Sequence, residues 1–160
     1  MQVRPTSDRL RETLFNVIAP RIEDARFLDL CAGSGAVGIE ALSRGASHVT
    51  FVDRSRRSCQ LIESNVALCR IPEEQYEIYS TTAEDYLRHG STPGTYPWDI
   101  VFFDPPYKED YLRTLDLLGS FGGLLIVEHH HKNNLPETIG TLAKTRILKQ
   151  GDSSLSFYEG

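Results

Sequence analysis

Apolar and polar positions alternate in short segments along this chain, and successive segments predict strands and helices in turn. Apolar residues at helical spacing predict an amphipathic helix over residues 6–19, which Thr6 or Ser7 caps and Pro20 ends. Buried strands are predicted at 27–30, 48–53, 76–79, 98–103 and 123–127. Helices are predicted between and around them, at 36–43, 55–69, 83–88 and 110–118.

Strands that alternate with helices predict an α/β, Rossmann-like fold with a mostly parallel sheet and helices on both faces. The chain ends differently, because residues 145–149 and 154–158 flank the turn-forming segment 150–153. This pattern predicts an antiparallel C-terminal hairpin at one edge of the sheet. Together the segments predict a seven-stranded sheet.

Composition limits the organisation of the protein. With 160 residues and 40% hydrophobic residues, we expect one domain over 1–160, with the helix over 6–19 packed on it, and a monomer. The longest apolar stretch, 121–127, is far shorter than the ~20 residues that a membrane-spanning helix needs. The three cysteines form no C-x-x-C pair and the first residues lack a signal-peptide core, so we expect a cytoplasmic protein.

The net charge of -5 argues against binding nucleic acid non-specifically, since such binding depends on many Lys and Arg contacts to phosphate. A nucleic-acid partner would have to meet a local basic patch. Two groups of arginines offer one, near the start of the chain and in its middle: Arg4, Arg9 and Arg11, and Arg54, Arg56 and Arg57.

A glycine-rich loop follows the first predicted strand and opens a helix, with glycines at Gly33, Gly35 and Gly38. Asp53 ends the next strand, where a carboxylate can accept hydrogen bonds from both hydroxyls of a ribose. The pattern predicts a cofactor that contains adenosine. Asp29, just before the loop, would repel a pyrophosphate but attract a sulfonium and an ammonium group, so it favours S-adenosylmethionine over NAD.

A second motif, Asp104-Pro105-Pro106-Tyr107, follows the apolar strand 98–103, at the sheet edge where ligands bind in open α/β folds. The prolines make the turn rigid, and they leave the Asp104 carboxylate and the Pro105 carbonyl as hydrogen-bond acceptors. Such acceptors suit an exocyclic amine, whose lone pair they turn toward a methyl donor. Tyr107 can stack on an extruded base.

These motifs resemble those of class I S-adenosylmethionine-dependent methyltransferases that modify exocyclic amines of bases. The segment from Arg4-Pro5-Thr6 to Phe15-Asn16 further resembles the signature of the bacterial 16S rRNA guanine-N2 methyltransferase family, and so does the late Lys149–Asp152 hairpin. The likeness extends over nearly the whole chain. Members of this family usually carry a longer, basic segment ahead of the Arg-Pro-Thr motif, which is largely missing from this sequence.

The resemblance implies methylation of guanine N2 in 16S rRNA, with S-adenosylmethionine as cofactor and a small-subunit assembly particle as the expected partner. It implies four residues at the target amine, Asp104, Pro105, Pro106 and Tyr107. It implies RNA contacts from Arg4, Thr6, Arg9 and Arg11. The expected cofactor contacts are Asp29, Ala32, Gly33, Ser34, Gly35, Gly38, Asp53, Thr82, Ala83 and Asp104.

Thr82 stands where the family often has an acidic residue, and Glu84 or Asp85 are alternatives for the contact to the cofactor's adenine. The other functions considered are adenine-N6 methylation of DNA, a non-catalytic cofactor-binding or RNA-binding module, and an NAD-dependent oxidoreductase. No metal is expected, because successive side chains of the run 129–131 should point to opposite faces of an extended segment.

Overall fold

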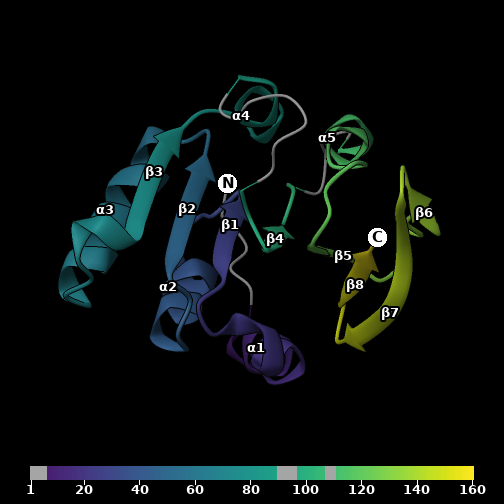
Figure 1. Cartoon of the computed structure of the whole chain (residues 1–160), viewed down its shortest axis with the longest axis horizontal. Helices are drawn as coiled ribbons and strands as arrows, with labels where there is room; N and C mark the ends of the chain where they lie inside the picture. The colour runs from purple at the N-terminus through teal and green to yellow at the C-terminus, as the bar shows by residue number, and fades with distance from the viewer. Residues whose placement is uncertain (1–6, 90–96, 107–110) are drawn as a thin grey trace.

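The strands in the described part of the protein all belong to one sheet. The computed structural model describes residues 7–89, 97–106 and 111–160. In these residues the sheet has eight strands, in the order β3-β2-β1-β4-β5-β8-β7-β6, which Figure 1 shows from left to right. The strands are β1 (Arg26–Leu30), β2 (His48–Asp53), β3 (Tyr76–Ser80), β4 (Ile100–Phe103), β5 (Leu124–His130), β6 (Thr138–Ile139), β7 (Leu142–Gln150) and β8 (Ser153–Glu159).

The first five strands run parallel, and the last three complete the sheet in antiparallel pairs. The predicted α/β fold with an antiparallel C-terminal hairpin is therefore confirmed. Helix α1 (Asp8–Ile22) precedes β1, and the helices α2 (Ala36–Ser43), α3 (Arg56–Leu68), α4 (Ala83–His89) and α5 (Leu112–Leu117) connect the parallel strands, with a short 3₁₀ turn at Glu73–Gln75.

The helices divide between the two faces of the twisted sheet (Figure 1). Side chains of α1, α2 and α3 pack in one apolar cluster with alternate residues of the strands. Side chains of α4 and α5 pack in a second cluster with the strand residues that point to the opposite face of the sheet. This division is what a parallel sheet requires, because its strands are apolar on both faces and each face must be covered.

Two predictions about elements are wrong. Pro20 does not end the first helix, which continues to Ile22. Pro20 is exposed, so the carbonyl that loses its helical partner can bond to water instead. The sheet has an eighth strand because the two-residue β6 pairs with the start of β7, a bridge too short to leave a periodic pattern.

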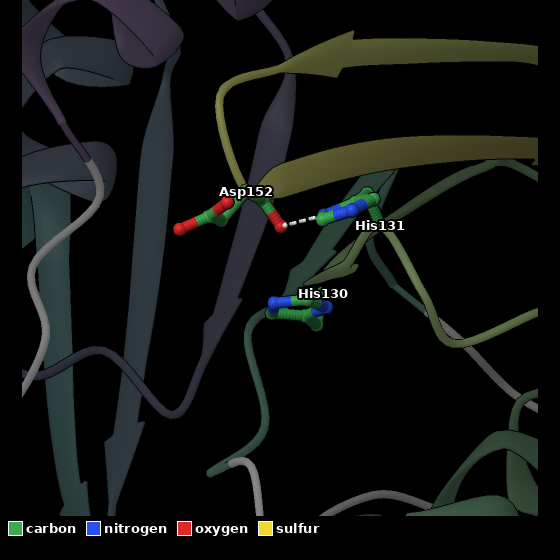
Figure 2. Close-up of side chains that lie close together, drawn as sticks. All are labelled: His130, His131 and Asp152. Carbon is green, nitrogen blue, oxygen red and sulfur yellow. Dashed lines mark hydrogen bonds between the residues drawn. The ribbon is translucent and has the colours of Figure 1, made fainter.

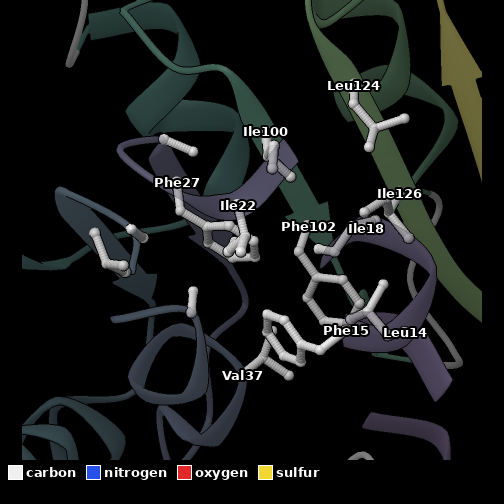
Figure 3. Close-up of a cluster of buried hydrophobic side chains, with 14 of the residues drawn as sticks. Leu14, Phe15, Ile18, Ile22, Phe27, Val37, Ile100, Phe102, Leu124 and Ile126 are labelled. Carbon is white, nitrogen blue, oxygen red and sulfur yellow. The ribbon is translucent and has the colours of Figure 1, made fainter. Parts of the chain in front are cut away.

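Helix α1 covers the sheet with five buried apolar side chains, Leu10, Leu14, Phe15, Ile18 and Ile22. Figure 3 shows four of them, Leu14, Phe15, Ile18 and Ile22, in one cluster with side chains of β1, β4 and β5. The Phe15 and Phe27 rings stack with their centroids 6.4 Å apart. The helix begins where Ser7 accepts a hydrogen bond from the Leu10 N–H, at 3.1 Å.

Charged side chains attach α1 to α2. Arg11 donates to Glu40 at 2.9 Å, and Arg44 donates to the other oxygen of the same carboxylate at 2.8 Å. The Arg44 guanidinium lies over the Phe15 ring, 5.3 Å from its centroid. Since α2 follows the glycine loop directly, these contacts fix the position of α1 relative to that loop. No helix in the described residues is long and apolar enough to cross a membrane.

The glycine at position 38 is required by the packing of α2 on β2. A Cβ atom there would lie 2.4 Å from Phe51 Cε1 and 2.8 Å from Val49 Cγ1, so the substitution Gly38→Ala must displace a buried side chain. We expect it to lower the free energy of unfolding by about 1–3 kcal/mol, the usual effect of overpacking a core. Urea unfolding of the two proteins measures the difference.

The matched control is Gly122→Ala. Nothing lies within 4 Å of a Cβ at position 122. Its free energy of unfolding should stay within about 0.5 kcal/mol of the parent value. Equal stability of Gly38→Ala and the parent protein would contradict the packing argument.

Candidate functional site

The sheet reverses its winding direction between β1 and β4. From β1 the chain continues outward to β2 and β3, whereas β4 and β5 lie on the opposite side of β1. The loops after β1 and β4 therefore leave the sheet in opposite directions at the carboxyl ends of the strands, the position where ligands usually bind in such folds. Leu30 and Phe103, the last residues of β1 and β4, are paired neighbours. The glycine loop and the Asp104 turn consequently start side by side.

The glycine loop forms a tight turn between β1 and α2. Gly33 and Gly35 have φ angles of 59° and 81°, in a region that residues other than glycine rarely adopt. The Gly35 N–H donates to the Ala32 carbonyl at 2.9 Å and closes the turn. The loop thus places backbone without side chains just after the carboxyl end of β1, as the glycine spacing predicts.

Asp29 lies beneath this loop and is almost fully buried. Its carboxyl accepts a hydrogen bond from the Gly38 N–H in the first turn of α2, at 3.1 Å. Burial raises the pKa of Asp29 from 3.8 to about 7; the Gly38 bond lowers the pKa, and the negative charge of Asp53 raises it. A cation beside Asp29 would favour the ionised form, so the position suits a positively charged ligand.

Asp53 ends β2 and points back to the glycine loop. One carboxylate oxygen accepts from the Gly33 N–H at 2.9 Å, and the other accepts from the Ser55 N–H at 2.8 Å. A carboxylate has about four acceptor positions, so each oxygen can accept one further hydrogen bond. The two backbone bonds fix the orientation of the carboxylate beside the glycine loop.

The Asp104 turn lies at the end of β4, next to β1. The Asp104 N–H donates to the Leu30 carbonyl at 3.3 Å, which continues the pairing of the two strands by one residue. Asp104 and Pro106 are partly exposed, and Pro105 is buried. Tyr107, the fourth residue of the motif, lies outside the described residues.

The predicted adenine contacts lie at the end of β3, beside β2. The Thr81 N–H donates to the Asp53 carbonyl at 3.1 Å, which brings this segment next to Asp53, the predicted ribose contact. The exposed Thr82 caps α4, because its hydroxyl accepts from the Asp85 N–H at 3.0 Å, and Ala83 is the first residue of the helix. Of the two acidic alternatives, Glu84 forms ion pairs with Arg88 and Arg113, while Asp85 is exposed.

The four predicted RNA-binding residues have different environments. Arg4 and Thr6 lie outside the described residues, and Arg9 is exposed at the start of α1. Arg11 is only 21% exposed and pairs with Asp8 at 3.0 Å as well as with Glu40. Its guanidinium therefore holds α1 against α2, a role that the sequence pattern does not reveal.

The histidine run contradicts the expected alternation. His130 ends β5 and His131 lies in the following turn, so their rings stack with centroids 4.5 Å apart. Figure 2 shows both rings beside Asp152, and ligand atoms of the three residues lie within 4.8 Å of one another. His129 is separate and lies 2.8 Å from the Ser156 hydroxyl.

The hydrogen bonds of this cluster disfavour a metal. His130 Nδ1 accepts from the Lys132 N–H at 3.1 Å, which places the ring proton on Nε2 and leaves that nitrogen without a free lone pair. His131 Nδ1 lies 3.1 Å from the Asp152 carbonyl, so only Nε2 of that ring can act as a ligand. We therefore assign no metal to His130, His131 and Asp152.

One side chain that contacts the loop is not among the predicted site residues. Asn65 in α3 donates from its amide nitrogen to the Ser34 carbonyl at 2.9 Å, across 31 positions of sequence. Nothing in the local pattern distinguishes Asn65 from other polar residues of an amphipathic helix. Only the packing of α3 against the loop reveals the contact.

The sequence model of the family described as "Conserved hypothetical protein 95" matches residues 1–159. The chain belongs to this family. It is 40% identical, over 163 residues, to ribosomal RNA small subunit methyltransferase D of Escherichia coli strain K12, an alignment that covers 98% of this chain and 79% of that protein. The predicted family resemblance is confirmed.

Solved structures agree with the fold. The hypothetical protein TTHA0928 of Thermus thermophilus is 28% identical and superposes with a TM-score of 0.84, covering 99% of this chain and 90% of that one. A structure of SMU.776 complexed with SAH is 16% identical, has a TM-score of 0.75, and is matched over 94% of this chain and 49% of that one. The second likeness shows a shared fold.

The raised pKa of Asp29 makes stability depend on pH. The folded protein holds a proton on Asp29 that the unfolded chain releases, so the free energy of unfolding should fall as pH rises from about 4 to about 7. In Asp29→Asn this contribution is absent, while the amide oxygen can still accept from Gly38. We expect the stability of the parent protein relative to Asp29→Asn to decline between these pH values and to level off above about pH 7.

Urea unfolding of both proteins at a series of pH values measures this difference. Comparing the two proteins removes the contribution of other titrating groups. A difference that is independent of pH would mean that Asp29 titrates normally in the folded state.

Proposed function

We propose that this protein transfers a methyl group from S-adenosylmethionine to the exocyclic N2 amine of a guanine in 16S rRNA. The observation that carries the proposal is the placement of two acceptor sites side by side at the carboxyl ends of neighbouring strands: Asp29 and Asp53 around the glycine loop, and Asp104 with Pro105 beside it. The similarity to ribosomal RNA small subunit methyltransferase D supports small-subunit rRNA as the substrate. SAH, which SMU.776 binds, is S-adenosylmethionine without its methyl group.

The residues around the loop fit this cofactor. Asp53 has acceptor positions left for two ribose hydroxyls, and its orientation is fixed by Gly33 and Ser55. The buried carboxyl of Asp29 favours a positive charge nearby, as an ammonium or a sulfonium provides. The partly exposed Gly33 has no side chain, so a ligand can approach its backbone closely, and the positive φ angles of Gly33 and Gly35 shape the turn.

S-adenosylmethionine supplies an electrophilic methyl group on a positively charged sulfur. Asp104 and the Pro105 carbonyl supply the complementary function at the amine. In free guanine the nitrogen lone pair is delocalised into the ring, which makes the amine a poor nucleophile. When both acceptors bind its two N–H groups, the amine is held with its lone pair directed at the methyl carbon.

The transfer itself is an in-line displacement. The amine nitrogen forms a bond to the methyl carbon while the sulfur–carbon bond breaks, and the electron pair of that bond stays on sulfur. The methylated nitrogen then carries a positive charge and loses one proton to water or to a carboxylate. Asp104 acts here as a hydrogen-bond acceptor that positions the amine, and the reaction requires no strong base.

The charge of the protein bears on its substrate. With a net charge of -5 and Arg11 engaged by Glu40, little of the surface is suited to attracting unstructured RNA. We therefore infer that shape and local contacts of an assembled small-subunit particle provide much of the binding energy. Of the four residues expected to contact RNA, Arg9 is the one that is described and exposed, at the start of α1, where it can contact a phosphate.

Removing the Asp104 carboxylate should lower turnover sharply even when S-adenosylmethionine is saturating. We expect Asp104→Ala to lower kcat at least about 100-fold, on the scale of losing one positioned polar partner in a transition state. The measurement is transfer of a labelled methyl group to small-subunit particles at saturating S-adenosylmethionine. Asp116→Ala, at an exposed position of α5, is the control and should keep full activity. Near-normal turnover by Asp104→Ala would rule out this mechanism.

The identity of the product distinguishes guanine from adenine chemistry. We expect nuclease digests of small-subunit rRNA to contain N2-methylguanosine that disappears in cells lacking the gene, with mass spectrometry locating the nucleotide. Replacing that guanosine by inosine, which lacks the 2-amine, should abolish methylation. Assembled particles should give more product than protein-free rRNA. N6-methyladenine in DNA as the only product would instead support the alternative function.

A further inference from the structure

The peptide unit between Ser34 and Gly35 is held at both of its polar ends. Its N–H, which belongs to Gly35, donates to the Ala32 carbonyl at 2.9 Å. Its C=O, which belongs to Ser34, accepts from the Asn65 side chain at 2.9 Å. The first bond is local to the turn, whereas the second comes from α3. The orientation of this peptide thus depends on a contact outside the loop.

Glycine at position 35 makes this external contact necessary. Glycine populates positive and negative φ about equally, so the backbone preference of residue 35 does not select one orientation of the Ser34–Gly35 peptide, and within the loop only the bond to Ala32 favours it. The observed φ of Gly35 is 81°, and a flip of the peptide would change it. A flip would also turn the Ser34 carbonyl away from Asn65 and break the bond from α3.

Packing of α3 brings Asn65 to the loop. Ile62, three residues earlier on the same helical face, is fully buried and packs closely against Gly35, where a Cβ atom would lie 3.1 Å from Ile62 Cγ1. Asn65 itself is partly buried. One face of α3 therefore makes two contacts with the same turn, an apolar one from Ile62 and a polar one from Asn65. The polar contact orients the Ser34 carbonyl.

We infer that Asn65 is a positioning residue for the cofactor: it fixes the orientation of the Ser34–Gly35 peptide and with it the backbone groups that the loop presents to S-adenosylmethionine. Asn65 acts through the loop and touches neither the methyl group nor the target amine. Its role lies in cofactor affinity, and the chemistry of methyl transfer is unaffected by it. The inference rests on the proposed cofactor site.

The sharpest test is Asn65→Asp, which is nearly isosteric and replaces the NH₂ donor with an acceptor facing the Ser34 carbonyl. We expect the Kd for S-adenosylmethionine, measured by calorimetry at pH 8, to rise about tenfold, the ratio that corresponds to losing one buried hydrogen bond. At saturating cofactor, kcat should stay within about twofold of the parent value, because Asp104 is unchanged. Asn65→Ala removes the donor without adding charge and should weaken binding in the same direction.

The matched control is Ser64→Asp. It adds the same charge at the neighbouring, exposed position of α3, where the serine hydroxyl bonds only within the helix, to the Gln60 carbonyl. Its cofactor affinity should equal that of the parent protein. Circular dichroism and urea unfolding of each variant without cofactor identify any variant that fails to fold, in which case Asn65→Ala carries the test.

Lowering the pH provides a rescue that a purely structural role would not give. A protonated carboxyl at position 65 can donate to the Ser34 carbonyl, so the ratio of the Asn65→Asp and parent Kd values should fall toward one as the pH is lowered toward the ordinary aspartate pKa of about 3.9. Equal affinity of Asn65→Asp, Asn65→Ala and the parent protein at pH 8 would overturn the inference. So would a defect confined to kcat. Failure of the parent protein to bind S-adenosylmethionine would instead overturn the proposed function.

Discussion

The hydrogen bond between the buried Asp29 carboxyl and the Gly38 N–H is the contact on which the candidate site depends. It joins the end of β1 to the first turn of α2, and the glycine loop is the chain between them. The site can form only because position 38 has no side chain, since α2 lies directly against Phe51 and Val49 of β2. This close packing buries Asp29 and raises its pKa to about 7. One packing constraint thus gives the loop its shape and leaves beneath it a carboxyl that favours a cation.

The same loop is held from its other sides by side chains that are distant in sequence. Asp53 binds the Gly33 N–H from β2, and Asn65 binds the Ser34 carbonyl from α3. Glu40, on α2, connects the loop's helix to α1 through Arg11. Arg9, a proposed RNA contact, lies on α1, so its position is coupled to that of the glycine loop. In the proposed function, one short piece of backbone would organise the binding of both substrates.

Much of the fold could be predicted because the signals are local. The strands β1, β2 and β4 are short apolar runs bounded by turn residues, and the glycine spacing marks the loop between the first strand and its helix. Pro20 shows where such rules fail, because a proline at an exposed helix end lets its missing hydrogen bond be replaced by water. The histidine run shows a second limit. Alternation of faces holds only within a strand, and β5 ends between His130 and His131.

Residue chemistry in the chain was thus enough to place Asp29, Asp53 and Asp104 at the ends of parallel strands, since those ends meet at one edge of the sheet. It could not show that Arg11 is occupied by Glu40, or that Asn65 reaches the loop. The first contact joins two helices and the second joins α3 to the glycine loop. The helical pattern reports which side of a helix is apolar without naming the polar partner at its margin. Those partners were decided by how the helices pack on the sheet, where a difference of one helical turn would have paired other residues.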